Sequence, residues 1–137
     1  MKTLRQCASV ILTNDAGHVL FVYQEQGRYG FPGGVVDVGE APAMAATREA
    51  REEANVEVGL GYIIGTYFLR GGGLPDVFAT VYRGYILSGT LKLDGREIVR
   101  LGWCDPRDPP TPLLSDAKAA LPDFLAGRRG VVRDYWR

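Results

Sequence analysis

One alanine-rich segment, residues 41–54, divides the chain into two parts that are rich in β-branched and aromatic residues. Its proline, Pro42, lies in the first turn, where a missing N–H costs no hydrogen bond. The segment is followed by Asn55, which tolerates the left-handed conformation that ends many helices. Strand-rich sequence on both sides of one strong helix predicts a mixed β-sheet with helices packed on its faces, an α/β fold of the α+β type.

Two pairs of β-rich runs flank this helix. Residues 7–13 and 18–23 are joined by a short polar turn, and residues 56–69 and 77–87 by a glycine-rich connection. Both patterns predict antiparallel hairpins. We further expect a strand over residues 98–104.

A final helix is predicted over residues 115–126. The basic segment that follows, residues 127–137, ends in aromatic residues and favours an exposed or subunit-docking tail over a substrate clamp. With 137 residues, the chain is long enough for one core, so residues 1–137 are expected to form a single domain.

Composition excludes several classes of partner. The 16 basic and 16 acidic residues cancel, so no net field attracts duplex nucleic acid or a membrane surface. No apolar run has the length of a signal peptide or of a membrane span. Cys7 and Cys104 are too few for a disulfide framework and are expected in the core. We therefore expect a cytoplasmic protein.

Three glutamates of the predicted helix, Glu49, Glu52 and Glu53, are spaced so that their carboxylates share one helix face. Like charges at this spacing repel, which a divalent cation with oxygen ligands, such as Mg²⁺ or Mn²⁺, can relieve. A solvated acidic face is the competing interpretation. Just upstream, Gly33 and Gly34 allow the backbone to approach an ion or a phosphate closely, which favours the metal site.

The stretch from Gly34 through Glu40 to Arg48 and on to Val56 resembles the Nudix box, G-x5-E-x7-R-E-U-x-E-E-x-G-U, where U is a bulky aliphatic residue. Six of its glycine and charged anchors match without a gap. Two positions depart: Asn55 replaces the last glycine and Ala50 is smaller than the usual aliphatic residue. The resemblance covers nearly the whole chain and implies a single Nudix domain, an α/β/α sandwich.

The resemblance also implies an activity, the hydrolysis of the pyrophosphate bond of a nucleoside diphosphate linked to another group, either a nucleoside triphosphate or an ADP-ribose-like compound. Clustered carboxylates suit this chemistry because phosphoryl transfer depends on positioning and on cations that neutralise developing charge. By their places in the motif, Glu52 and Glu53 are implied to be metal ligands, and Glu49 a third ligand or the base. The Gly33 carbonyl completes the shell of the metal ion.

Three further residues receive roles from the same resemblance. Arg48 restrains the glutamates, and Glu40 acts at the helix start. Glu97, which precedes the predicted strand at residues 98–104, is a second candidate for the base, or else a solvated turn residue. A small nucleotide is the expected partner, and a homodimer is the default assembly.

Two alternatives stay open. Asn55 and Ala50 are compatible with a non-catalytic, nucleotide-binding or regulatory module of the same fold, and a purely structural acidic helix without metal is the third interpretation. For the substrate cleft, the sequence offers aromatic and strand residues that could equally be core: Phe21, Tyr23, Tyr29, Phe31, Asp76, Phe78 and Tyr82.

Overall fold

The computed structural model describes residues 4–24, 26–92 and 98–137. Its elements, in chain order, are β1 (Arg5–Ile11), β2 (Val19–Gln24), β3 (Tyr29–Gly30), β4 (Gly33–Val35), α1 (Pro42–Ala54), β5 (Val56–Arg70), β6 (Val77–Gly89), β7 (Ile98–Cys104), α2 (Ser115–Leu125) and β8 (Val131–Trp136). Neither helix in these stretches is long and apolar enough to cross a membrane.

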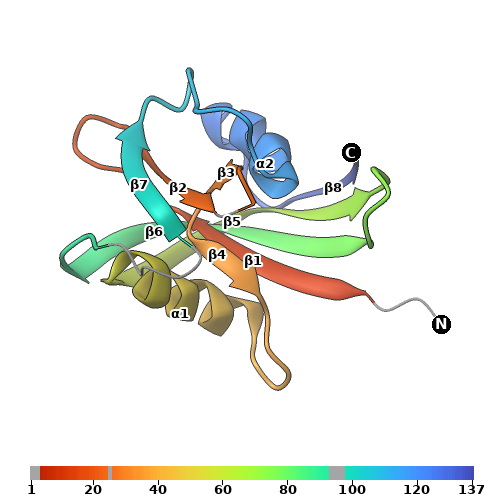
Figure 1. Ribbon diagram of the computed structural model, residues 1–137, viewed down its shortest axis with the longest axis horizontal. Helices are drawn as coiled ribbons and strands as arrows, with labels where there is room; N and C mark the ends of the chain where they lie inside the picture. The colour runs from red at the N-terminus through yellow and green to blue at the C-terminus, as the bar shows by residue number, and fades with distance from the viewer. Residues whose placement is uncertain (1–3, 25, 93–97) are drawn as a thin grey trace.

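The strands form two sheets. The larger sheet has the order β4-β1-β6-β5-β8, and the smaller sheet has the order β3-β2-β7. Two pairs in the larger sheet, β1 with β6 and β5 with β8, are parallel, and the others are antiparallel. The helices α1 and α2 lie on opposite faces of the larger sheet (Figure 1). This confirms the predicted mixed sheet and sandwich architecture.

Helix α1 forms where the sequence predicts it. Pro42 occupies its first turn, and Asn55 caps its end in the left-handed conformation, with φ 60° and ψ 39°. Ala46, Ala50 and Ala54 are fully buried, so the helix packs closely against the larger sheet. Ala50, which is smaller than the Nudix pattern prefers, therefore lies in the core beneath the acidic face.

The second predicted hairpin is confirmed, because β5 and β6 pair along most of their length. The first is confirmed only next to its turn, where Thr13 and Val19 form an antiparallel bridge and the Leu20 N–H donates to the Leu12 oxygen over 3.0 Å. In the turn itself the Asn14 side chain accepts hydrogen bonds from the N–H groups of Ala16 and His18. The strands then diverge into different sheets, because both edges of β1 are occupied by β4 and β6.

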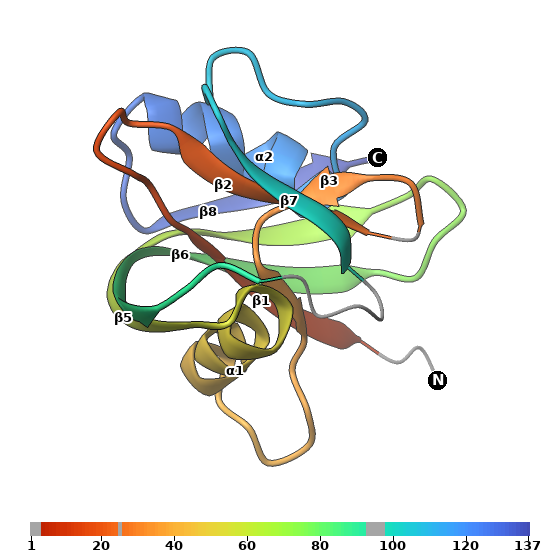
Figure 2. The ribbon, with the colours of Figure 1, turned by 60° about the vertical axis from the view of Figure 1, so that its left-hand side comes forward.

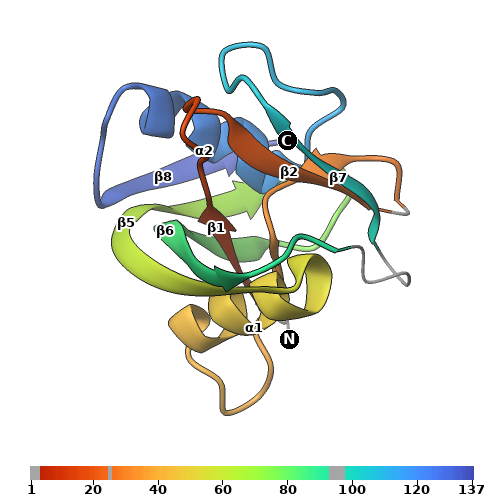
Figure 3. The same cartoon turned by 90° about the vertical axis from the view of Figure 1, so that its left-hand side faces the viewer.

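The predicted tail is wrong, because most of residues 127–137 form β8, which lies alongside β5 at the edge of the larger sheet (Figures 2 and 3). The strand is tied to α2 through Asp123, whose side chain is 3% exposed. This carboxylate accepts hydrogen bonds from Tyr67 over 2.9 Å and from Arg133 over 2.8 and 2.7 Å. Arg128 adds a third partner at 3.1 Å. Chiefly because of Arg133, the pKa of Asp123 lies below its usual range.

The core has two main parts, one on each side of the larger sheet. Ala50, Ala54 and Val56 pack with Val10 of β1 and with Leu12 on the α1 side. On the other side, α2 packs against Tyr67 and Leu69 of β5 and against β2. Cys104 is partly buried at the edge of the second part.

Candidate active site

The three glutamates of α1 differ sharply in their exposure. Glu53 is buried, with 3% of its surface exposed. The side chain of Glu49 is 14% exposed and that of Glu52 is 47% exposed. The acidic face therefore begins in the core and ends in solvent, which places its charges at the border between protein and water.

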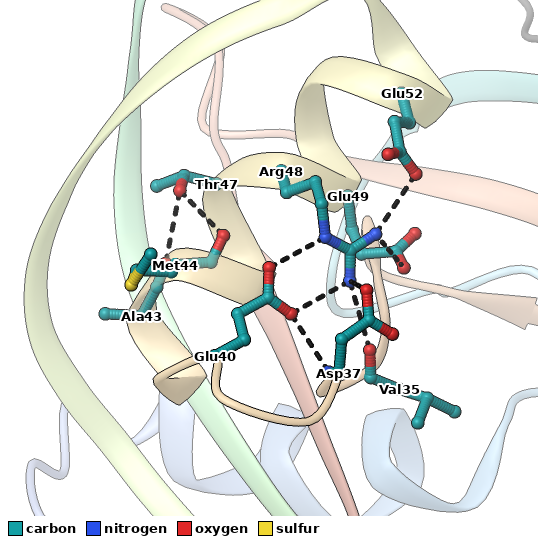
Figure 4. A network of polar contacts seen from close by, with 9 residues as sticks. All are labelled: Val35, Asp37, Glu40, Ala43, Met44, Thr47, Arg48, Glu49 and Glu52. Carbon is teal, nitrogen blue, oxygen red and sulfur yellow. Dashed lines mark hydrogen bonds and ion pairs between the residues drawn. The ribbon is translucent and has the colours of Figure 1, made fainter.

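Arg48 brings the acidic side chains together (Figure 4). Its Nη1 donates to Glu49 over 3.0 Å and to Glu52 over 3.1 Å. One cation thus lies between two carboxylates that would otherwise repel each other along the helix. Arg48 therefore contacts two of the three glutamates of the helix, Glu49 and Glu52.

The other nitrogens of Arg48 hold the segment that precedes the helix. Nε donates to Glu40 over 2.8 Å and Nη2 over 3.1 Å. Nη2 also donates to the carbonyl oxygen of Val35 over 3.2 Å. Glu40 in turn accepts from the N–H of Asp37 over 3.0 Å. The Arg48 guanidinium lowers the pKa of Glu40, and Glu40 raises the pKa of Arg48, so the pair stays charged at neutral pH.

The two glycines of β4 leave room for close approach on both sides of the strand. A Cβ on Gly34 would lie 2.6 Å from a carboxylate oxygen of Glu49. A Cβ on Gly33 would lie 2.5 Å from the backbone oxygen of Ala8 and 2.6 Å from the Cα of Ser9. Gly34 therefore makes space for the Glu49 carboxylate, whereas Gly33 makes space for β1.

A cavity of about 490 Å³ lies beside Gly34 of β4 and Glu49 of α1. Gly33, Gly34 and Glu49 line it together with residues from β1, the β5–β6 connection, α2 and the end of the chain. Its charged lining residues are Arg5, Asp37, Glu49, Asp116 and Arg137. A space of this size and mixed polarity is within the range of small-molecule sites.

Two groups in the cavity wall, the Asp116 carboxyl and the Cys7 thiol, have raised pKa values. Burial raises the pKa of Asp116. Burial, with the negative charge of Asp116 nearby, raises the pKa of the Cys7 thiol to about 11. Cys7 was predicted in the core, but it is partly exposed and lines the cavity as a neutral thiol.

The family model described as the NUDIX domain matches residues 3–124. A Bacillus subtilis (strain 168) protein named "Putative 8-oxo-dGTP diphosphatase" is 32% identical over 127 residues, which cover 92% of this chain and 83% of that protein. The chain belongs to the Nudix family. As a Nudix hydrolase, it is an enzyme that acts on phosphoric anhydrides.

Solved structures agree with the Nudix fold. A MutT NUDIX hydrolase from Burkholderia pseudomallei matches with a TM-score of 0.82 and 24% identity, over 89% of this chain and 98% of that one. An ADP-ribose pyrophosphatase from Streptococcus suis 89-1591 matches with a TM-score of 0.75 and 20% identity, over 97% of this chain and 100% of that one. At these identities the likeness concerns the fold.

The predicted site residues of this Nudix hydrolase lie at different places relative to the cavity. Gly33, Gly34 and Glu49 line the cavity. Arg48 joins Glu49 to Glu52 and Glu40 in the network beside it. Glu53 lies deepest, and Glu97 falls outside the described residues.

Several cavity residues were not predicted, and some predicted ones lie elsewhere. On β6 the lining residues are Val77 and Ala79, whereas Phe78 contacts Phe68 edge-to-face and Tyr82 packs toward α1. Of the two alternatives that the sequence leaves open for Phe78 and Tyr82, the structure favours packing over lining of this cavity. Of the predicted aromatic residues, only Phe31 is part of the cavity wall. Arg5, Asp116 and Arg137 belong to no local motif, although the basic character of the last segment was a signal for Arg137.

The carboxylates of the Nudix box have the donor chemistry of a hard-cation site. Carboxylate and carbonyl oxygens are the ligands that Mg²⁺ prefers. Across residues 4–24, 26–92 and 98–137, no three acidic, histidine or cysteine side chains converge as a metal cluster. The reason is visible in the network, because Arg48 holds Glu49 and Glu52 by their oxygens. The donor chemistry still fits a hard cation, because the Glu52 side chain is 47% exposed and the space above Gly34 admits the Glu49 carboxylate.

Proposed function

We propose that this Nudix hydrolase cleaves the pyrophosphate bond of a nucleoside diphosphate linked to another group, with Mg²⁺ or Mn²⁺ as cofactor. The observation that carries the proposal is the entry of Glu49 into the cavity beside Gly34, where a side chain on residue 34 would displace it. The Glu49 carboxylate and the glycines of β4 thereby border a space large enough for a nucleotide.

In the proposed reaction, the oxygen of a water molecule bonds to a phosphorus of the bridge, and the bond from that phosphorus to the bridging oxygen breaks. The electron pair of the broken bond leaves with the departing phosphate. Glu49 or Glu97 accepts the proton of the attacking water. Glu49, Glu52, Glu53 and the Gly33 carbonyl are the proposed metal ligands. A divalent cation supplies neutralisation of the charge that develops on the phosphate oxygens.

Arg48 has a positioning role in this proposal. Its hydrogen bonds keep Glu49 and Glu52 near each other when their charges are not otherwise compensated. Glu40 fixes the guanidinium from the other side. The pair therefore holds the ligands close to their working positions, which lowers the cost of organising them.

We propose a nucleoside triphosphate as the substrate, with 8-oxo-dGTP tested first. The name of the Bacillus subtilis relative supports this choice. An ADP-ribose-like substrate is the next to test, because one structural neighbour is named an ADP-ribose pyrophosphatase. The neutral balance of charges supports a small nucleotide, rather than duplex nucleic acid or a membrane, as partner of a single cytoplasmic domain. A homodimer is the proposed assembly.

The test is a hydrolysis assay with Mg²⁺ and a panel containing 8-oxo-dGTP, ordinary nucleoside triphosphates, ADP-ribose, nucleotide sugars and dinucleoside polyphosphates. Mass spectrometry identifies each product. Metal-dependent release of a nucleoside monophosphate from one class is the expected result. The Glu53→Gln variant is expected to lose at least about 100-fold in turnover, the scale seen when one charge-stabilising group is removed.

Glu57→Gln is the matched control, because Glu57 is an exposed glutamate that pairs with Arg51 over 2.6 Å, outside the cavity. Circular dichroism checks that both variants are folded. Equal turnover in Glu53→Gln and Glu57→Gln contradicts the proposed metal site. A folded protein that hydrolyses nothing in the panel contradicts the proposed reaction.

A further inference from the structure

The connection between β5 and β6 forms part of the cavity wall although it has little to fix its own shape. Gly71, Gly72 and Gly73 all have positive φ, at 80°, 70° and 72°. Glycine runs lose more conformational freedom on ordering than other residues. Within the connection, the N–H of Leu74 contacts the oxygen of Gly71 at 3.4 Å, which is long for a hydrogen bond. Even so, Leu74 lines the cavity while 59% exposed.

Arg137 supplies the missing anchor. Its Nη2 donates to the carbonyl oxygen of Pro75 over 2.8 Å and to that of Leu74 over 3.3 Å. The same nitrogen reaches the oxygen of Leu69, and Nε reaches that of Arg70, each over 3.3 Å. One guanidinium thus joins the end of β5 to the far side of the connection.

The backbone packs as closely as the side chain. The Arg137 N–H donates to the oxygen of Arg70 over 2.7 Å, which extends the β5–β8 ladder. A Cβ on Gly72 would lie 3.2 Å from the Cβ of Arg137, and one on Gly71 would lie 3.4 Å from the ring of Trp136. The end of β8 therefore lies directly against the glycine run, as Figure 1 shows at the label C.

This wall stands away from the acidic end of the cavity. On β1, Arg5 is opposite Val77, whereas Ala8 is opposite Gly34, the glycine beside the Glu49 carboxylate. Three residues of strand separate the two positions, which corresponds to about 10 Å. Arg137, Leu74 and Val77 therefore face the part of a bound molecule that is remote from Glu49.

We propose that Arg137 is a positioning residue that fixes residues 71–76 as the wall for the nucleoside part of the substrate. Its loss weakens binding of the substrate and leaves the chemical step unchanged, because the reacting phosphates lie at the other end. The binding half of this inference rests on the proposed function. The ordering of the wall by Arg137 does not.

The test compares Arg137→Met, which keeps the length of the stem, with Arg137→Lys, which keeps the charge. Asp134→Asn is the control, since Asp134 lies on the same strand and pairs with Arg70 over 2.8 Å but does not line the cavity. Amide hydrogen exchange over residues 71–76 is measured in the ligand-free protein. Steady-state kinetics with Mg²⁺ then separates KM from kcat for the substrate found in the panel.

Arg137→Met is expected to accelerate exchange over residues 71–76 about tenfold, the effect of losing hydrogen bonds to a charged donor. KM is expected to rise about tenfold, while kcat stays within about twofold. Arg137→Lys is expected to resemble Arg137→Met, because an ammonium cannot reproduce the planar set of donors. Asp134→Asn is expected to match the wild type in all three values.

Unchanged exchange in Arg137→Met overturns the ordering role. Faster exchange with an unchanged KM overturns the role in substrate binding. Wild-type exchange and wild-type KM in Arg137→Lys would show that the positive charge alone orders the wall, which overturns the role of the planar guanidinium. A wild-type protein without turnover contradicts the proposed function, and in that case the exchange comparison by itself supports or overturns the ordering of the wall.

Discussion

Arg48 makes two hydrogen bonds to the single carboxylate of Glu40, from Nε over 2.8 Å and from Nη2 over 3.1 Å. Two parallel N–H···O bonds fix the guanidinium plane as well as its position. The remaining nitrogen, Nη1, is thereby directed toward Glu49 and Glu52. A residue before the helix therefore decides where the acids of the helix lie.

Glu40→Gln is expected to reduce kcat/KM by about 10- to 100-fold, as mutations of residues that support metal ligands do. The amide keeps the shape of the side chain but accepts from Arg48 through one oxygen only. Steady-state hydrolysis with Mg²⁺ measures the effect, and Glu57→Gln is again the control. Equal kcat/KM for the two variants contradicts a positioning role for Glu40.

Gly34→Ala is expected to reduce turnover at least about tenfold while changing the free energy of unfolding by less than about 1 kcal/mol. The added methyl group meets the end of the flexible Glu49 side chain and displaces its carboxylate. The substitution therefore lowers turnover more than stability. Gly102→Ala is the control, because a Cβ at Gly102 has no atom within 4 Å. Urea denaturation and the hydrolysis assay give the two quantities. A fully active Gly34→Ala variant contradicts the proposed place of Glu49.

Asn55→Ala is expected to be about 1 kcal/mol less stable than Asn55→Gly, since a residue with a Cβ is strained in the left-handed conformation. Both variants lose the hydrogen bond from the Asn55 side chain to the Thr90 oxygen, 2.9 Å long. Their comparison therefore isolates the backbone effect. Thermal unfolding measures it. Asn55→Gly is expected to keep wild-type turnover within about twofold, and a large gain in its turnover would indicate that Asn55 weakens the site.

Asp123→Asn is expected to lower the free energy of unfolding by about 2–3 kcal/mol at pH 7. This is slightly less than for a fully buried ion pair, because Arg133 is half-exposed. The pKa of Asp123 is lowered in the folded protein, chiefly by Arg133. Its contribution is therefore complete above the ordinary aspartate pKa of about 3.9 and is lost as the pH falls through the lower folded value.

Urea denaturation at pH 7 and at pH 3 tests this expectation. The difference between wild type and Asp123→Asn should shrink at pH 3. Asp134→Asn, which removes an exposed ion pair, should change stability by less than about 1 kcal/mol at either pH. A difference for Asp123→Asn that does not depend on pH contradicts the assignment of its stability to charge.

The parts of the fold that sequence predicts well are those with local signals. Helix α1 has its proline start, its alanine face and its asparagine end, and β5 and β6 are neighbours joined by a glycine-rich connection. The pairing of β1 and β8 has no such local signal, because each pairs with a strand that is distant in the sequence. Arg5 of β1 lies opposite Val77, and β8 extends the sheet beyond β5.

The same distinction applies to the site. The residues of the Nudix box lie on one helix and on the segment before it, so their spacing is sufficient to bring them together. Arg5, Asp116 and Arg137 meet in one cavity only because three distant chain segments do. On β6, alternation indicates two faces but not which of them lines the cavity, so the sequence leaves Phe78 and Tyr82 open between cleft and core.

The parallel pairing of β1 with β6 also has a consequence for synthesis of the protein. β1 lies between β4 and β6, and its partner residues on β6 begin with Val77. At ribosomal speeds of about 5–20 residues per second, these residues follow β1 about 4–14 seconds later. Throughout that interval only β4 is present to pair with β1, on one edge. The nascent chain therefore carries one unpaired strand edge until β6 leaves the ribosome.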